Sequence, residues 1–184
     1  LDATSAINPE YDFRAINNHD VMMIERITSR NYSNATLNIC SFNGPKQSKW
    51  AIYNKPQREN KLKEIISAYL KVIGSILTPN DKLLVATYME VVPLFSEHNP
   101  YKDQVKFIHW GSKDARGSND FKDFNKAMII GLFRKPLHYY VSSVMAINQF
   151  DHYVSTTGSV WSDAIYLKDL LIVDDMIQFF NRIR

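Results

Sequence analysis

Residues 82–131 contain three short apolar runs: KLLVATY at 82–88, VKFIHW at 105–110 and AMIIG at 127–131. Apolar runs of this length are typical of strands buried on both faces of a sheet. We expect strands at 83–87, 105–110 and 127–131, with a helix near 90–97 between the first two and a polar loop before the third. Strands separated by helices or crossover loops form parallel sheets. The pattern therefore predicts an α/β fold with a mostly parallel central sheet flanked by helices.

The regions on both sides of these runs supply further elements. Apolar residues spaced three and four apart predict an amphipathic helix from Gln57 to Leu77. Downstream, helices are predicted at 137–150 and at 162–184, the latter with a break near residues 173–175. Upstream, short β-favouring runs such as Thr36–Phe42 and Trp50–Tyr53 predict strands joined by loops.

Length and composition indicate one folded domain. The 184 residues are 45% hydrophobic and 22% charged, which is enough for a substantial core. No repeat, low-complexity tract or linker divides residues 1–184, so a single α/β domain is expected. The first residue is not Met and Arg184 falls within a helical pattern, which indicates a fragment of a longer polypeptide. The net charge of +3 neither requires nor opposes a nucleic-acid partner.

Cysteine content and hydropathy indicate the compartment. The single cysteine, Cys40, excludes an internal disulfide and a multi-cysteine zinc site, and it is typical of a reducing compartment. No apolar run approaches the roughly 20 residues that span a bilayer, and the first residues lack the layout of a signal peptide. We therefore expect a cytoplasmic protein with no membrane partner. The Lys-, Asn- and Ile-rich composition is typical of an AT-rich genome, and for a virus or plasmid the compartment would be the host cytoplasm.

The polar loop GSKDARGSNDFKD at 111–123 has the composition of a ligand-binding loop. Gly117 lets the backbone approach a ligand closely, because it carries no side chain. Arg116, Ser118 and Asn119 offer hydrogen-bond donors suited to phosphate oxygens. The plainer interpretation is a turn whose Gly, Ser and Asn residues satisfy backbone geometry.

Other polar residues are expected at the same edge of the sheet. Thr87 ends one predicted strand, and Gly111 and Ser112 follow directly after another. Ligands of open α/β sheets bind beyond the carboxyl ends of the strands, so these residues can reach one ligand together with the loop. Thr87 suits a phosphate contact and Tyr88 a stacked base, although a tyrosine here is also typical of a core.

Four stretches, taken in order, resemble the motifs of the second RecA-like domain of superfamily 1 and 2 helicases, especially phage- and plasmid-type superfamily 2 enzymes. Leu1–Ser5 is similar to motif III, Lys82–Tyr88 to motif IV and Ala115–Asp123 to motif V. The ending Gln178–Arg184 is similar to motif VI. The resemblance covers nearly the whole chain and implies a RecA-like three-layer domain.

The resemblance implies roles for the residues at the two ends of the chain. Arg182 would stabilise charge on a phosphoryl group transferred from ATP, and Gln178 would hydrogen-bond near the nucleotide. Arg184 falls one residue early for the usual motif, and it diverges from Arg182 by about 200° on a helix. Thr4 would couple the state of the bound nucleotide to the contacts with the nucleic-acid strand. The plainer alternatives are a basic helix end that offsets the helix dipole and a solvated glutamine.

The same resemblance implies partners and cofactors. Gly117, Ser118 and Asn119 would touch the backbone of single- or double-stranded nucleic acid, with DNA favoured over RNA. The sequence has no Gly-x-x-x-x-Gly-Lys-Ser/Thr loop and no strand that ends in paired acids. ATP and Mg²⁺ would therefore be held mainly by an N-terminal RecA-like domain of the same polypeptide. The expected function is the second motor domain of an ATP-dependent helicase or translocase.

Two other classes of function stay open. One is a RecA-like module that binds nucleic acid or protein without hydrolysis. The other is a metal-dependent nuclease built on His109, Asp114, Asp120 and Asp123, but their spacing matches no metal motif and solvated loop acids are the simpler interpretation. No metal site is therefore predicted.

Overall fold

The computed structural model describes residues 36, 48–110, 112, 120–147 and 159–180. The chain divides into two compact units. The helical unit comprises 1–42 and 134–175, and the sheet unit comprises 43–133 and 176–184. Apart from Thr36, the strand predicted at 36–42 lies outside the described residues, as does Cys40.

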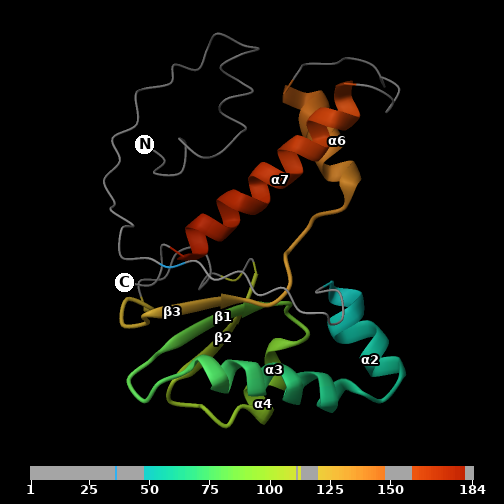
Figure 1. Ribbon diagram of the computed structural model, residues 1–184. Helices are drawn as coiled ribbons and strands as arrows, with labels where there is room; N and C mark the ends of the chain where they lie inside the picture. Colours follow the sequence, from blue (N-terminus) through green and yellow to red (C-terminus); the bar gives the residue numbers. More distant parts are fainter. Residues whose placement is uncertain (1–35, 37–47, 111, 113–119, 148–158, 181–184) are drawn as a thin grey trace. The chain divides into compact units, whose positions relative to one another are not determined.

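The sheet unit is built on three parallel strands, as the sequence predicted (Figure 1). They are β1 (Leu83–Thr87), β2 (Val105–His109) and β3 (Lys126–Ile129), in the order β2-β1-β3. In the register, Leu83 faces Val105 on one side and Lys126 on the other. The strand ends lie within two residues of their predicted positions. The α/β class with a parallel central sheet is therefore confirmed, with a small sheet.

Both faces of the sheet are covered, because β1 is buried along its whole length. Leu83 and Val85 pack in one cluster with buried residues of α3 (Leu62–Ile76) and α4 (Val92–His98). Leu84 and Ala86 pack on the opposite face with Phe121 and with Phe179, near the end of α7 (Ser159–Phe180). Alternate side chains of one strand thus contribute to two cores. This arrangement is consistent with the three layers of a RecA-like domain.

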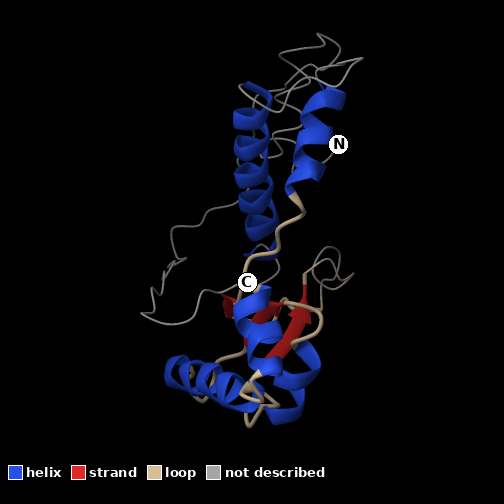
Figure 2. Cartoon of the chain, turned by 90° about the vertical axis from the view of Figure 1, so that its right-hand side faces the viewer, coloured by secondary structure: helices blue, strands red, loops and turns tan. Residues whose placement is uncertain are grey.

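The helical unit contains α6 (Leu137–Ile147) and most of α7, which lie side by side in both views (Figures 1 and 2). Tyr140, Val141 and Val144 of α6 pack with buried apolar residues of α7, namely Val160, Ala164 and Leu167. The break predicted near residues 173–175 is wrong, because α7 continues through them. Val and Asp have modest helix propensity, but neither interrupts a helix as Gly or Pro does.

The segment before α3 differs from the prediction in two ways. Trp50–Asn54 forms the π-helix η1, where a strand was predicted. Ile52 of this segment is fully buried in the core with α3 and β1, so tertiary packing overrides the β-favouring composition. The single helix predicted from Gln57 is divided into α2 (Lys55–Arg58) and α3, because Asn60 takes a left-handed backbone with φ of 54°.

Within the described part of the chain, none of the helices combines the length and the apolar character that crossing a membrane requires.

Candidate functional site at the carboxyl edge of the sheet

Of the polar residues predicted at the carboxyl edge of the sheet, the structure describes Thr87 and Ser112. Thr87 and His109 end β1 and β2 as register partners, and the Trp110 amide donates to the Thr87 carbonyl at 3.1 Å. Because the chain adds β2 on one side of β1 and β3 on the other, the strand order reverses at β1. Ligands of open α/β sheets bind outside the carboxyl ends of strands at such a reversal. This edge is therefore the candidate site.

The hydroxyl of Thr87 is the most unusual group at this edge. The residue is fully buried, and its Oγ1 has no hydrogen-bond partner among the described residues. Leaving a buried hydroxyl unpaired costs about 1–3 kcal/mol. Valine has nearly the same shape and would carry no such cost. The hydroxyl is therefore suited to a partner that the described residues do not supply.

An ion pair lies beside the end of β1. Lys49 Nζ donates to Glu90 Oε1 at 2.5 Å, and both side chains are partly exposed, 46% and 32% respectively. The pKa of Glu90 is lowered. The largest cause is the hydrogen bond from Lys49, and a backbone hydrogen bond and the charges of Lys49 and His109 act in the same direction. His109 Nδ1 donates to the Trp110 carbonyl at 3.0 Å, because a carbonyl only accepts. This edge therefore holds cationic and hydrogen-bonding groups of the kind that anions use.

A second set of contacts fixes the backbone around this edge. Trp110 Nε1 donates to the Gly131 carbonyl at 3.0 Å, and the Tyr88 hydroxyl donates to the Leu132 carbonyl at 3.0 Å. Gly131 has a φ of 81°, and a Cβ there would collide with the Tyr88 ring. Tyr88 is thus used in packing, which is the alternative that the sequence left open. The Trp110 and Phe179 ring centroids lie 5.6 Å apart, so the residue before the polar loop contacts the end of α7.

The structure describes only part of the predicted site. Ser112 makes a turn, with its amide donating to the His109 carbonyl at 3.2 Å, and Gln178 is half-buried in α7 one residue before Phe179. Thr87, Ser112 and Gln178 all belong to the sheet unit. The remaining predicted residues lie outside the described residues: Thr4, Gly111, Arg116, Gly117, Ser118, Asn119, Arg182 and Arg184.

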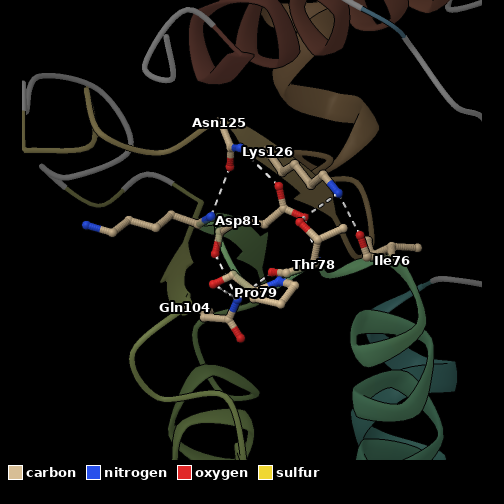
Figure 3. Close-up of polar contacts among 8 residues, drawn as sticks. Ile76, Thr78, Pro79, Asp81, Gln104, Asn125 and Lys126 are labelled. Carbon is tan, nitrogen blue, oxygen red and sulfur yellow. Dashed lines mark hydrogen bonds and ion pairs between the residues drawn. The ribbon is translucent and has the colours of Figure 1, made fainter.

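The opposite edge of the sheet carries a dense polar cluster, drawn in Figure 3. Asp81 is 7% exposed and accepts hydrogen bonds from the Thr78 amide at 2.6 Å and the Thr78 hydroxyl at 2.7 Å. Asn125 Nδ2 donates to the same carboxylate at 3.0 Å, and Lys126 Nζ does so at 2.7 Å. These contacts, led by the hydrogen bond from Lys126, hold the pKa of Asp81 far below its ordinary value.

The Asp81 cluster links helices and strands to one another, and its polar groups are used in these links rather than for binding a ligand. Lys126 Nζ also donates to the Ile76 carbonyl at 2.7 Å, which links β3 to the end of α3. Gln104 Nε2 donates to the Thr78 carbonyl at 2.7 Å and to the Asp81 carbonyl at 3.1 Å. The carboxylate therefore has a structural role at the amino ends of the strands.

Two residues of the carboxyl edge, Lys49 and Glu90, were missed by sequence reasoning. They are 41 positions apart, and Lys49 lies in a region with no predicted ligand contact. Glu90 lies three residues after Thr87, which was an available signal, because the first turn after a parallel strand is a common position for ligand contacts.

The nuclease alternative requires a cluster of metal ligands. Among the described residues, no three His, Cys, Asp or Glu side chains are grouped so that they could hold a metal ion. Asp114 lies outside the described residues.

Comparison with known proteins identifies no relative. No protein-family model matches the chain, and neither the curated proteins nor the solved structures include a significant match. The resemblance to helicase motifs is therefore a prediction that rests on the residues of this chain and on the fold just described.

Proposed function

We propose that this chain is the second RecA-like motor domain of an ATP-dependent nucleic-acid helicase or translocase. The observation that carries the proposal is the buried, unpaired Thr87 hydroxyl at the carboxyl end of the central strand. It lies where an open parallel sheet presents residues to ligands, beside the segment that leads into the loop at 111–123.

In the proposed mechanism the carboxyl edge grips the phosphate backbone. The Thr87 hydroxyl is fully buried, so it donates to the loop that holds the phosphate, and Arg116, Ser118 and Asn119 supply donors to the phosphate itself. Lys49 offers a cation that a phosphate can share with Glu90. Such contacts bind the strand without reading its bases, which suits translocation along any sequence.

The nucleotide would be bound by a partner RecA-like domain that carries the phosphate loop and the magnesium-binding acids. Arg182 would then complete that ATP site, and Gln178 precedes it by four residues in the sequence. Trp110 supports this coupling, because its ring contacts Phe179 while its indole N–H holds the Gly131 carbonyl. Closure of the two domains on ATP and their opening after hydrolysis would shift the grip along the strand.

The decisive experiment measures ATP hydrolysis by the complete helicase with and without single-stranded DNA or RNA. We expect stimulation by the strand, and a loss of about 10³-fold or more in Arg182→Ala, as for other arginines that act on a transferring phosphoryl group. Without stimulation, or with an Arg182→Ala variant as active as wild type, the motor proposal fails and the non-hydrolysing binding module replaces it.

A pair of threonine variants tests the role of the edge itself. Thr87→Val keeps the buried shape and removes the hydroxyl, so strand binding should weaken about 5- to 10-fold while the free energy of unfolding is unchanged or rises. Thr78→Val is the matched control in the Asp81 cluster, and it should lower the free energy of unfolding and leave strand affinity intact. Unchanged strand affinity in Thr87→Val would remove Thr87 from the site.

A further inference from the structure

Helix α6 presents a polar and aromatic face on the side opposite its packing contacts. Its buried residues, Tyr140, Val141 and Val144, belong to the core shared with α7. The exposed residues on the other side include His138, Tyr139 and Ser142. Positions 138, 139 and 142 fall within one face of a helix about 100° wide. With the exposed Arg134 and the partly exposed Lys135, which precede the helix, these residues form what we call the α6 surface.

The α6 surface is cationic and free of acidic residues in the sequence. No Asp or Glu occurs between residues 131 and 150, whereas Arg134 and Lys135 are adjacent. The acids of the helical unit's described part all lie on α7: Asp163, Asp169, Asp174 and Asp175. A flexible anionic chain that binds here would therefore meet no repulsion from acidic side chains of residues 131–150.

The Tyr139 ring and Lys135 contact each other on this surface. Lys135 Nζ lies 3.7 Å from the centroid of the Tyr139 ring, and the Lys135 amide donates to the Tyr140 hydroxyl at 3.0 Å. The Tyr139 and Tyr140 rings meet edge to face at 5.4 Å, so one side of Tyr139 is supported by the packed side of α6. Tyr139 nevertheless stays 37% exposed. The Tyr139 ring is thus oriented by Lys135 and Tyr140 and keeps an exposed part that a planar ligand can reach.

We propose that the α6 surface is a second contact for single-stranded nucleic acid. A base displaces the Lys135 ammonium from the Tyr139 ring and stacks there, and Arg134, the released Lys135 and the Ser142 hydroxyl meet the flanking phosphates. A single strand fits better than a duplex, because only unstacked bases offer a free face to an aromatic side chain. The inference takes the class of partner, nucleic acid, from the proposed function. It adds a contact site in the helical unit, whereas the phosphate contacts proposed above belong to the sheet unit.

The test measures binding of a labelled oligothymidylate by fluorescence anisotropy across a salt series, using the full chain. Tyr139→Leu keeps apolar cover over Tyr140 and removes the stacking ring, so affinity should fall roughly 5- to 150-fold. Tyr139→Phe keeps the ring and should bind within about twofold of wild type, since stacking needs only the aromatic face. Arg134→Gln should lower the dependence of log affinity on log salt by about 0.7, the value of one phosphate contact on a single strand.

Tyr166→Leu is the matched control. Tyr166 is 59% exposed on α7, between Asp163 and Asp169, and an anionic strand should avoid it, so this variant should bind as wild type does. Equal losses in Tyr166→Leu and Tyr139→Leu would overturn the inference, because the effect would then be general. Displacement of the oligonucleotide by polyglutamate, with no effect of Tyr139→Leu, would also overturn it and indicate an acidic protein partner.

The outcomes separate this inference from the proposed function. If wild type binds the oligonucleotide and Tyr139→Leu binds equally well, the α6 surface is excluded while the grip at the sheet edge stands. If Tyr139-dependent binding occurs but no strand stimulates ATP hydrolysis, the motor proposal fails and the α6 surface stands. If wild type binds no single strand at all, both are wrong.

Discussion

The two ends of the small sheet are built in opposite ways. At the amino ends of the strands, the Asp81 carboxylate is matched by donors from Thr78, Asn125 and Lys126, and the cluster joins α3, β1 and β3. At the carboxyl ends, Thr87 holds a buried hydroxyl without a partner in the described residues, and the nearest ion pair is partly exposed. A satisfied polar network stabilises a fold, whereas a buried polar group without a described partner requires another explanation, such as a water molecule, an ion or a ligand. The difference gives the amino end a structural role and leaves the carboxyl end as the candidate site.

The largest effect on stability is expected from Asp81→Ala. The substitution leaves the donors of Thr78, Asn125 and Lys126 in a partly buried site without their acceptor, which costs more than the loss of an exposed contact. Its matched control at the other end is Glu90→Ala, which removes an exposed ion pair and should change the free energy of unfolding by only about 0–1 kcal/mol. Denaturant unfolding of both variants measures the difference, and equal losses would refute the contrast between the ends.

The next effect concerns the packed part of the carboxyl edge. Gly131→Ala places a Cβ on a left-handed backbone and against the Tyr88 ring, so we expect a loss of about 2–4 kcal/mol in the free energy of unfolding. A double-mutant cycle with Tyr88→Leu sharpens the test, because a smaller side chain relieves the collision and the two losses should not add. Additive losses would show that the backbone angle alone accounts for the cost.

The smallest effect is the acid dependence of stability. The pKa of Asp81 is lowered in the folded chain, so its contribution is complete above the unfolded value of about 3.9 and declines as the pH falls towards the folded value. The pKa of Glu90 is lowered as well and adds to the same decline. Between about pH 4.5 and pH 3, the free energy of unfolding should fall less steeply in Asp81→Asn than in wild type. Parallel pH profiles would contradict the role given to Asp81. Only part of the stability that Asp81 contributes is lost in this pH range, because the pKa of its carboxyl in the folded chain lies below the range.

Prediction from the sequence succeeded where burial determines the pattern. The run at 83–87 is buried at every position, which is the pattern of a strand covered on both faces of a parallel sheet. Prediction failed at Trp50–Asn54, because aromatic and β-branched residues serve a buried helix turn as readily as a strand once Ile52 enters the core. The helix break at Asn60 had a local signal, since Asn adopts the left-handed backbone more readily than most residues.

The candidate site, like the fold, contains residues that the sequence indicated and residues that it did not. Thr87 was predicted from its position at the end of a strand, and the parallel sheet brought it next to His109. The pairing of Lys49 with Glu90 and the contact of Trp110 with Phe179 join residues far apart in the sequence, so no local pattern indicates them. The use of Tyr88 in packing depends on the φ of Gly131, which also becomes visible only in the folded chain.

By itself, the sequence determined the α/β class and the three strands, because hydrophobic periodicity and chain order are local properties. The tertiary structure decided which polar groups are satisfied. It paired Asp81 with Lys126, 45 residues away, and it left the Thr87 hydroxyl buried without a described partner. Whether a polar group stabilises the fold or is retained for a ligand depends on what surrounds it in space, and long-range packing alone sets those surroundings.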